Sequence, residues 1–459
     1  MTDTHPLLAW MAGLVLTAAL LLGGGTMQGL PGDAIVIALG LLLGVLLVWV
    51  WPMATLTAYS VELLLLAGML VLPLLQLIPL PPVLWTHLAG RATLAADQAS
   101  VGIGAHWAPL SLDPAGTWRA WYALLPGAAL FVAALTLPSR VMERLVTLVI
   151  GIAVASTVLG FAQLAGGPHS ALRLFAITDP TDAVGLFANR NHFASLLYCA
   201  LALACGALIK GWIDVFRDRE TRWLTHLYRG VAVAILILGL TIADSRAGIV
   251  LGMGVVLGAL CMILRTPILR RDALHGFGLV LLIAFVVSIQ FGLYAVMARF
   301  QQDPFDDARV WIYQATLHAA RHYGLLGSGI GSFVHALPQF QTRATLIPQY
   351  VNHAHNDWLE LWLEAGLPFA ILAALVVAWL LRCGGRVWRR SLAPSGTILR
   401  ARAASIGLLA VLLHSAVDYP LRPLANEAVF ALLVALLVRG AAIADIADSA
   451  DIRTAGAMA

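Results

Sequence analysis

The densest cluster of polar side chains in the sequence runs from Asn352 to Glu360 and reads Asn-His-Ala-His-Asn-Asp-Trp-Leu-Glu. Asp357 and Glu360 have the spacing of a capping box, with Asp in place of Ser or Thr, and an apolar stretch follows them. We therefore expect His355 just outside a helix N-terminus, where the helix dipole disfavours a positive charge on the imidazole. A neutral histidine can act as a general base toward an attacking hydroxyl group. The alternative is that His353 and His355 are interfacial capping residues without a catalytic role.

The same segment also reads His-x-His-x-Asp, a pattern that metal hydrolases use. The residue after it is Trp358 rather than a further histidine, and the predicted outer segments contain no second group of candidate ligands. The glycine-rich run at 324–331 has no strand before it and no Gly-Lys-Ser or Gly-Lys-Thr after it, so it does not predict a nucleotide-binding loop. The sequence therefore predicts no metal, no cofactor and no nucleotide.

Three arginines in predicted outer turns form the second candidate group. Arg190 and Arg309 follow polar turns, and Arg246 follows Ser245, which can cap the next helix. Guanidinium groups beside helix N-termini pair bidentately with phosphate oxygens, so these residues predict a site for a diphosphate. Each arginine also has an ordinary explanation. Arg190 and Arg246 could anchor their helices at the membrane interface, and Arg309 could pair with Asp306 or Asp307.

Further polar residues stand next to these two groups. Glu364 follows Glu360 by one helical turn and is expected inside the hydrocarbon, where an ionisable group is costly and is usually functional or paired. The turn between His414 and Arg422 contains Asp418 and Tyr419, and a capped proline turn explains it at least as well as a role in a site. We expect the substrate to be contacted by Arg190, Asn191, His353, Asn356 and Glu364.

The elements that must position these residues are membrane-spanning helices. The chain has 459 residues, 60% hydrophobic and 11% charged, whereas a soluble domain has about 25% charged residues. Apolar stretches close to the ~20 residues that cross a bilayer recur along almost the whole chain. We predict twelve spans, at approximately 7–23, 33–50, 55–78, 120–137, 145–165, 192–209, 230–243, 247–264, 277–296, 362–381, 403–417 and 424–442.

The basic residues predict the orientation of these spans. With an even number of spans and both termini inside, most of the 28 lysines and arginines fall in the cytoplasmic connections, as the positive-inside rule requires. The net charge of +4 therefore reflects topology, and the short basic loops lack the aromatic residues of a nucleic-acid surface. We predict membrane lipid, and no nucleic acid, as a partner.

The predicted fold is an all-α polytopic membrane protein with about twelve transmembrane helices. Residues 1–296 would hold spans one to nine, with an outer loop at 79–119. Residues 297–361 would form a helical catalytic loop on the outer side, because no other extramembrane segment is as long. Residues 362–442 would hold spans ten to twelve, and 443–459 would be a cytoplasmic tail.

Four segments in this spacing resemble the family of O-antigen ligases and O-antigen polymerases. They are His-Ala-His-Asn-Asp-Trp-Leu-Glu-Leu-Trp-Leu-Glu-Ala-Gly at 353–366, Asp-Ser-Arg-Ala-Gly at 244–248, Gly-Ser-Gly-Ile-Gly-Ser-Phe at 327–333 and the segment around Arg309. The histidine motif is the most specific of them, and the resemblance covers mainly residues 180–425.

The resemblance implies a GT-C-type glycosyltransferase of lipopolysaccharide biosynthesis in the bacterial inner membrane. Such enzymes have about twelve spans and a large periplasmic loop between the ninth and tenth. They move a glycan from undecaprenyl diphosphate to an acceptor hydroxyl at the periplasmic face, without a metal ion. The mechanism implied is a single displacement with inversion, and the acceptor is a further glycan or lipid A core.

Carried over to this chain, His355 resembles the family's base, and Arg246 and Arg309 resemble the arginines that hold the donor diphosphate. His353 stands beside this base, so which histidine matches it stays open, as does the choice between ligase and polymerase. A transporter or flippase for an anionic lipid-linked glycan is the alternative from another class. It would need ionisable groups along a path through the bilayer, whereas the polar clusters here gather on one face.

Overall fold

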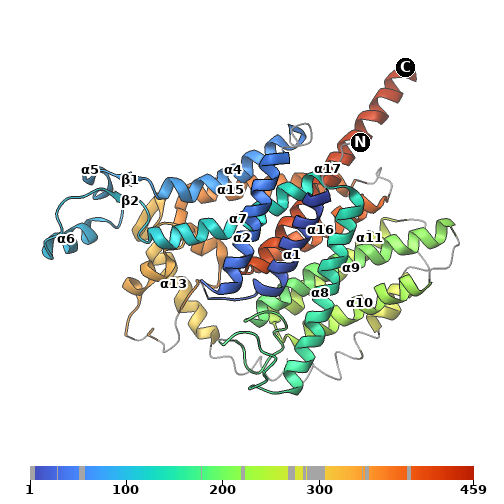
Figure 1. The fold of residues 1–459 in the computed structure, drawn as a ribbon, viewed down its shortest axis with the longest axis horizontal. Coiled ribbons are helices and arrows are strands. Elements are labelled where there is room, and N and C mark those ends of the chain that lie inside the picture. The colour runs from blue at the N-terminus through green and yellow to red at the C-terminus, as the bar shows by residue number, and fades with distance from the viewer. Residues whose placement is uncertain are drawn as a thin grey trace.

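The structure is a computed structural model that describes residues 6–27, 29–50, 57–176, 178–218, 223–266, 274–282, 286, 305–343, 345–346, 351–389 and 394–458. Regular structure in these residues is almost entirely helical (Figure 1). The α-helices are α1 (Pro6–Leu22), α2 (Pro31–Val50), α4 (Ser60–Gln76), α5 (Pro82–Trp85), α6 (Ala92–Ser100), α7 (Pro114–Thr136), α8 (Ser139–Ala165), α9 (Arg190–Asp218), α10 (Trp223–Ile242), α11 (Arg246–Leu264), α13 (Phe305–Tyr323), α14 (Phe333–Ala336), α15 (Asp357–Val387), α16 (Gly396–His414) and α17 (Leu424–Met458).

Short elements complete the described chain. The 3-10 helices are η1 (Thr57–Tyr59), η3 (Gly324–Leu326) and η4 (Leu337–Phe340). Strands β1 (Pro79–Leu80) and β2 (Ala108–Pro109) pair antiparallel, and this pairing closes the loop that carries α5 and α6. In Figure 1 this loop extends away from the bundle, on the side where α13 lies.

Nine of the described helices are long and apolar enough to cross a membrane. They are α2, Thr57–Gln76, α7, α8, Arg190–Asp214, α11, α15, α16 and Leu424–Ile446, and α1 and Leu227–Ile242 are shorter apolar helices. The prediction of an all-α polytopic membrane protein is confirmed. The count of twelve and the GT-C architecture stay predictions, because most of the predicted ninth span at 277–296 lies outside the described residues.

Several helices are longer than hydropathy predicts, α7 and α15 because their first turns are polar and α17 at its C-terminal end. Helix α7 begins at Pro114 instead of 120, since the Asp113 side chain accepts a hydrogen bond from the Gly116 amide (2.9 Å) and proline suits a first helical position. Helix α15 begins at Asp357 instead of 362. Helix α17 continues to Met458 through the predicted tail, whose alanine content favours a helix.

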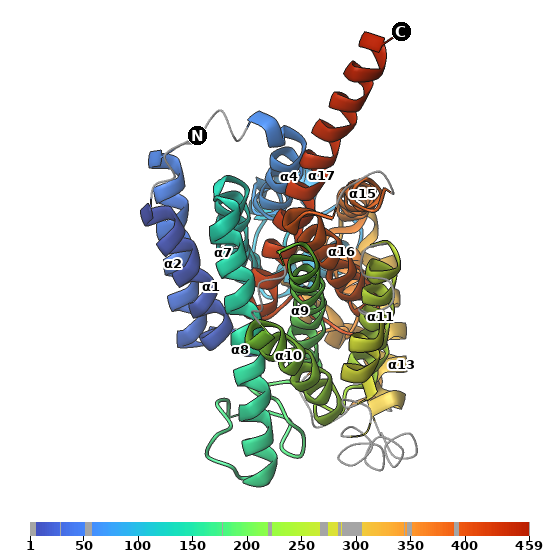
Figure 2. The same ribbon diagram turned by 90° about the vertical axis from the view of Figure 1, so that its right-hand side faces the viewer.

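Helix α9 lies at the centre of the bundle. It packs against α10, α11 and α16 (Figure 2), and most of its spanning residues are buried. Helix α16 in turn packs against α17. These contacts bring the N-terminus of α9 close to the turn between α16 and α17, which is the framework of the site described below.

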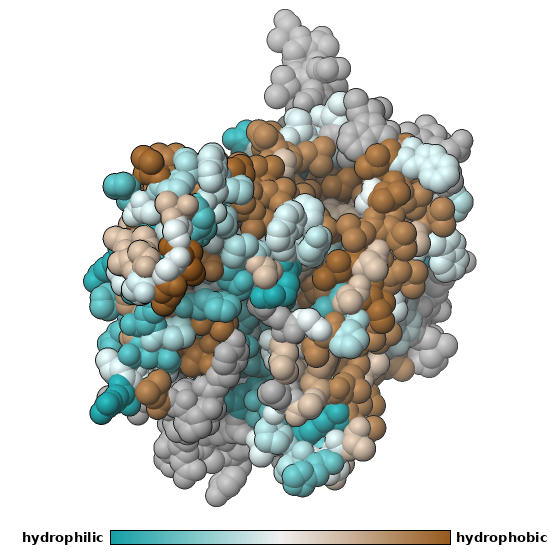
Figure 3. Space-filling view, turned by 60° about the vertical axis from the view of Figure 1, so that its left-hand side comes forward, coloured by the Kyte–Doolittle hydropathy of each residue, from teal (hydrophilic) through white to brown (hydrophobic). Residues whose placement is uncertain are grey.

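The segment between η3 and α15 forms a second, smaller core with α13. Its buried residues include Ile312, Tyr323, Phe333, Leu337 and Leu363. Leu363 belongs to α15, so this core fixes the long loop on the helix that follows the histidine motif. Figure 3 shows polar residues gathered on one side of that view and apolar residues covering much of the rest, as expected of a bundle surrounded by lipid.

Candidate active site

The histidine motif lies at the start of α15, but the helix is capped differently from the prediction. Asn356 is the N-cap residue, and its side chain accepts a hydrogen bond from the Leu359 amide (3.0 Å). The predicted capping box of Asp357 and Glu360 is therefore wrong. The Glu360 carboxylate instead accepts from the Ala354 amide (2.7 Å) and contacts His353 Nδ1 (2.8 Å), because a buried carboxylate is satisfied best by several donors.

His355 stands just outside the helix, as predicted, in a left-handed backbone conformation with φ of 50°. The Tyr313 hydroxyl of α13 holds it there by donating to the His355 carbonyl oxygen (2.7 Å). Among the described residues, the other non-glycine position with positive φ is Asp244, which precedes Arg246. Such conformations are costly for a residue with a side chain and concentrate at functional sites. His355 lies in the histidine motif and Asp244 in the Asp-Ser-Arg turn, the two motifs from which the site was predicted.

Asp418 is the partner of His355. Its Oδ1 atom lies 3.0 Å from His355 Nδ1, and its side chain is 1% exposed, compared with 24% for His355. The Tyr419 amide (3.0 Å) and the Asn191 side-chain amide also donate to the Asp418 carboxylate. Because an ionised carboxylate only accepts, Nδ1 of His355 carries a hydrogen, and in a neutral imidazole Nε2 then carries the lone pair.

The surroundings of Asp418 keep it ionised. Burial by itself raises the pKa of this carboxyl, but the hydrogen bond from His355 and its electrostatic interaction with the neighbouring imidazoles hold the pKa well below its usual range. His414 reaches the cluster from the end of α16, where its Nδ1 lies 3.0 Å from Ser195 Oγ and 3.1 Å from Tyr198 OH. The site therefore contains a fixed negative charge directly behind one imidazole.

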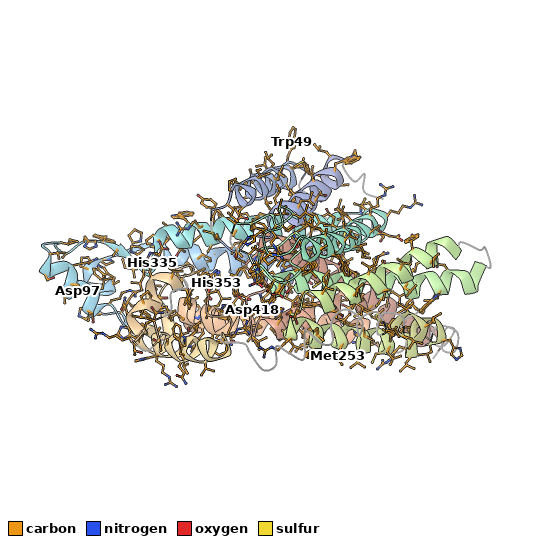
Figure 4. All side chains as sticks on the ribbon, turned by 90° about the horizontal axis from the view of Figure 1, so that it is seen from below. Trp49, Asp97, Met253, His335, His353 and Asp418 are labelled. Carbon is orange, nitrogen blue, oxygen red and sulfur yellow. The ribbon has the colours of Figure 1, made fainter. Side chains whose placement is uncertain are left out.

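Tyr419 separates the histidines of this cluster. Its ring centroid lies 4.4 Å from that of His353, 4.7 Å from that of His192 and 5.0 Å from that of His355. In Figure 4 both His353 and Asp418 lie in the central part of the molecule. His353 is 7% exposed, and its Nδ1 atom is already hydrogen-bonded to Glu360. The geometry thus favours His355 over His353 as a base.

A buried ionic cluster lies below the histidine motif. The Arg422 guanidinium contacts Asp357 Oδ1 (3.2 Å), Glu360 Oε1 (2.8 Å) and Glu364 Oε2 (3.8 Å). Glu364 is fully buried, and its Oε1 atom also accepts from the amides of Gly331 (2.9 Å) and Phe333. Arg422 therefore links α15 to the turn before α17, and Glu364 links α15 to the glycine-rich turn.

Arg246 and Arg190 are the first residues of α11 and α9. Ser245 caps α11 as predicted, accepting from the Gly248 amide (3.1 Å). Burial raises the pKa of Asp244 to about 6, the carboxylate of Asp182 adds to this rise, and the charges of Arg190 and Arg246 oppose it. Both arginines therefore act on one carboxylate. The Arg190 guanidinium also forms an ion pair with Asp182 (2.8 Å).

Arg309 lies in the second turn of α13, one turn before Tyr313. Burial raises the pKa of Tyr313, the positive charge of Arg309 opposes this rise, and the charge of Asp418 adds to it. Arg309 is thus within electrostatic reach of the residue that fixes His355. Burial raises the pKa of Asp179, the hydrogen bond from the Arg190 amide (2.8 Å) opposes this rise, and the charge of Asp418 adds to it. These links bring the three predicted catalytic residues, His355, Arg246 and Arg309, to one end of the bundle.

The residues predicted to contact substrate have internal partners. Arg190 pairs with Asp182, Asn191 donates to Asp418, Asn356 caps α15, and His353 and Glu364 belong to the buried clusters. Their contact with a substrate stays a prediction. Within the described residues no three His, Cys, Asp or Glu side chains are arranged to hold a metal ion, and metal independence also stays a prediction.

Sequence reasoning missed the roles of Asp418, Tyr419 and Arg422. It identified the turn that contains them but could not assign partners across the fold. One signal was available, since an intramembrane Glu364 requires a partner and Arg422 is a cation in an outer turn of the predicted topology. Only packing identifies which cation it is.

The fold and the site define a polytopic helical membrane protein with a histidine, carboxylate and arginine site at one end of its bundle. A family model described as O-antigen ligase matches residues 231–375, which include Arg246, Arg309 and His355. This match supports assigning the chain to the family of O-antigen ligases and polymerases, and with it a glycosyltransferase type of enzyme. No curated protein matches the chain.

Proposed function

We propose that the protein transfers a glycan from undecaprenyl diphosphate to a sugar hydroxyl of an acceptor, at the periplasmic face of the bacterial inner membrane. The observation that carries this proposal is the His355–Asp418 pair, at 3.0 Å, at the same end of the bundle as Arg246 and Arg309. A base supported by a buried carboxylate, beside cations at helix starts, suits attack of a hydroxyl group on a sugar whose leaving group is a diphosphate.

The chemistry is a single displacement that inverts the anomeric carbon. Nε2 of His355 accepts the proton of the acceptor hydroxyl as its oxygen forms the new bond to the anomeric carbon. The bond from that carbon to the diphosphate oxygen breaks, and undecaprenyl diphosphate leaves with the electron pair. Asp418 stabilises the imidazolium that forms, while Arg246 and Arg309 stabilise the charge that develops on the leaving diphosphate. No metal takes part in this proposal.

The buried residues around the site have positioning roles in this proposal. Asn191 and Tyr419 orient Asp418, and Asn356 fixes the start of α15. Arg422 and its three carboxylates hold the segment that carries His355. Arg190, paired with Asp182, holds the turn before α9 beside Asp244.

The test is incubation of the purified protein with an undecaprenyl-diphosphate glycan and candidate acceptors, with release of undecaprenyl diphosphate and glycan transfer both measured. We expect His355→Ala to lower the rate by at least ~10²-fold, the lower end of general-base effects. His318→Ala is the matched control, because His318 is an exposed histidine of α13 that packs on Phe340. Normal transfer by His355→Ala would refute the proposed base.

The same assay separates the enzyme from a transporter, since a transporter would move the donor without releasing undecaprenyl diphosphate. The acceptor distinguishes ligase from polymerase. A strain that lacks the protein would accumulate a ladder of lipid-linked repeats if the protein is a ligase that uses lipid A core. It would accumulate single repeats if the protein is a polymerase.

A further inference from the structure

A second polar region lies at the other end of the same helices. A cavity of about 90 Å³ lies between α8, α9, α10 and α16. Helix α9 begins at Arg190 in the candidate active site and reaches this cavity at Lys210, which is ~30 Å along a helix rising 1.5 Å per residue. That length equals the thickness of a bilayer's hydrocarbon core. Helix α16 likewise begins here at Gly396 and ends at His414. The cavity and the active site therefore lie at opposite membrane faces.

The cavity is lined by three cations and one anion. The cations are Lys210, Arg229 and Arg400, and the anion is Glu143. Arg400 Nη1 and Glu143 Oε2 are 3.9 Å apart, which is longer than a hydrogen bond. Lys210 also pairs with Asp214 one turn further along α9 (2.6 Å). The lining carries a net positive charge and so favours an anionic ligand.

Arg400 provides independent evidence for a missing acceptor. Its side chain is 14% exposed, and its Nε atom is buried without a hydrogen-bond acceptor in the part of the chain that the structure describes. Buried N–H groups are nearly always hydrogen-bonded, and an anion bound in the adjacent cavity would supply such an acceptor to Arg400. The cavity next to it, at about 90 Å³, is several times the ~15 Å³ that a single water molecule needs.

The start of α16 leaves space for this ligand. A side chain at Gly396 would place its Cβ atom 3.0 Å from Lys210 Cε and 3.5 Å from Arg400 Nη1, so the glycine keeps the two cations accessible. Ser395 caps the helix through the Ile398 amide alone (3.3 Å). Other amides of this first turn add positive potential on the same side as the side-chain cations.

We propose that this cavity binds the phosphate group of an anionic phospholipid from the leaflet opposite the active site. The cavity lies at headgroup depth, and basic pockets between transmembrane helices on the cytoplasmic side suit such headgroups. Val146 and Ile150 of α8 continue the lining from Glu143 toward the bilayer centre, where an acyl chain begins. Tyr228, 58% exposed at the rim, is the kind of aromatic residue found at membrane interfaces.

The experiment compares wild type, Lys210→Gln and Arg229→Gln after reconstitution into nanodiscs of mixed phosphatidylglycerol and phosphatidylcholine. Mass spectrometry of the gently released protein then counts each lipid that stays bound. Arg140→Gln is the matched control, because it removes the same charge from an exposed position at the same end of α8, outside the cavity. We expect wild type and Arg140→Gln to retain phosphatidylglycerol preferentially. Lys210→Gln and Arg229→Gln should each retain about tenfold less, the effect of one charge-assisted hydrogen bond.

Equal retention of phosphatidylglycerol by all four proteins would overturn the proposal, as would equal retention of the two lipids by wild type. A second arm tests free phosphate, by heating delipidated protein in detergent with millimolar inorganic phosphate. Phosphate that protects wild type but not Lys210→Gln, without preferential lipid retention, would identify a site for a soluble anion and overturn the lipid assignment. Glycan transfer measured on each variant confirms that it is folded.

Discussion

Replacement of Asp418 by asparagine tests the proposed role of the buried carboxylate most directly. The change removes one negative charge and alters almost no volume. Asn191 can rotate its side-chain amide to accept from the new amide group, and the Tyr419 amide keeps an oxygen acceptor. The main loss is the charge that faces His355 Nδ1 at 3.0 Å. We therefore expect a folded protein with a weakened base.

The size of this loss follows from the burial of the pair. Asp418 is 1% exposed, so solvent screens the interaction little. A hydrogen bond to a charged group contributes ~1.5–3 kcal/mol, which corresponds to a rate reduction of about 10-fold to 10²-fold when it is needed in the transition state. The Tyr419 amide and His355 Nδ1 contact the same atom, Oδ1, so an asparagine oxygen in that position keeps the hydrogen on Nδ1 and the loss reflects the charge alone.

The assay is glycan transfer by wild type, Asp418→Asn, His355→Ala and the double variant. If Asp418 acts through His355, Asp418→Asn should lower the rate in the wild-type background and have almost no further effect when His355 is absent. Thermal unfolding of the four proteins separates catalysis from stability. Equal loss of rate from Asp418→Asn in both backgrounds would refute the reasoning, because the carboxylate would then act independently of the imidazole.

Three further predictions follow from the arginines and from Asp244. Arg246→Ala and Arg309→Ala should each lower the release of undecaprenyl diphosphate by ~10²-fold. The control Arg119→Ala, which removes an exposed arginine paired with Asp113, should leave the rate unchanged. An unchanged rate in Arg246→Ala or Arg309→Ala would exclude that arginine from the diphosphate site. Arg422→Met should lower the free energy of unfolding by ~3–5 kcal/mol, because it leaves buried carboxylates without their cation; an unchanged melting temperature would contradict this. Asp244→Asn should gain stability relative to wild type as pH rises from about 4 to about 6, since the folded state holds the Asp244 proton more tightly than the unfolded chain and loses that advantage over this range. Asparagine tolerates the positive φ at this position, and a stability difference that is constant with pH, measured by thermal unfolding in detergent, would show that Asp244 does not titrate in this way.

The sequence by itself determined the features that depend on neighbouring residues. Apolar length predicted the spanning helices, because each must satisfy its own backbone hydrogen bonds in lipid. Ser245 caps α11 as predicted, and His355 lies just before α15, because a cap is a contact between residues three positions apart. The proximity of Arg246, Arg309 and the histidine motif was predicted from resemblance to a family rather than from local pattern.

Only the tertiary structure decided how the polar residues pair. Asp418 contacts His355 across 63 positions of sequence. Arg422, in the turn between α16 and α17, contacts Glu360 and Glu364 of α15. The predicted capping box failed for the same reason, since Glu360 is satisfied by His353 and the Ala354 amide rather than by the helix start. A buried charge takes whichever partners packing brings within reach, because leaving it unpaired costs more than any local preference. The packing of α15 against α16 and α17 selects those partners, and no pattern of neighbouring residues encodes that choice.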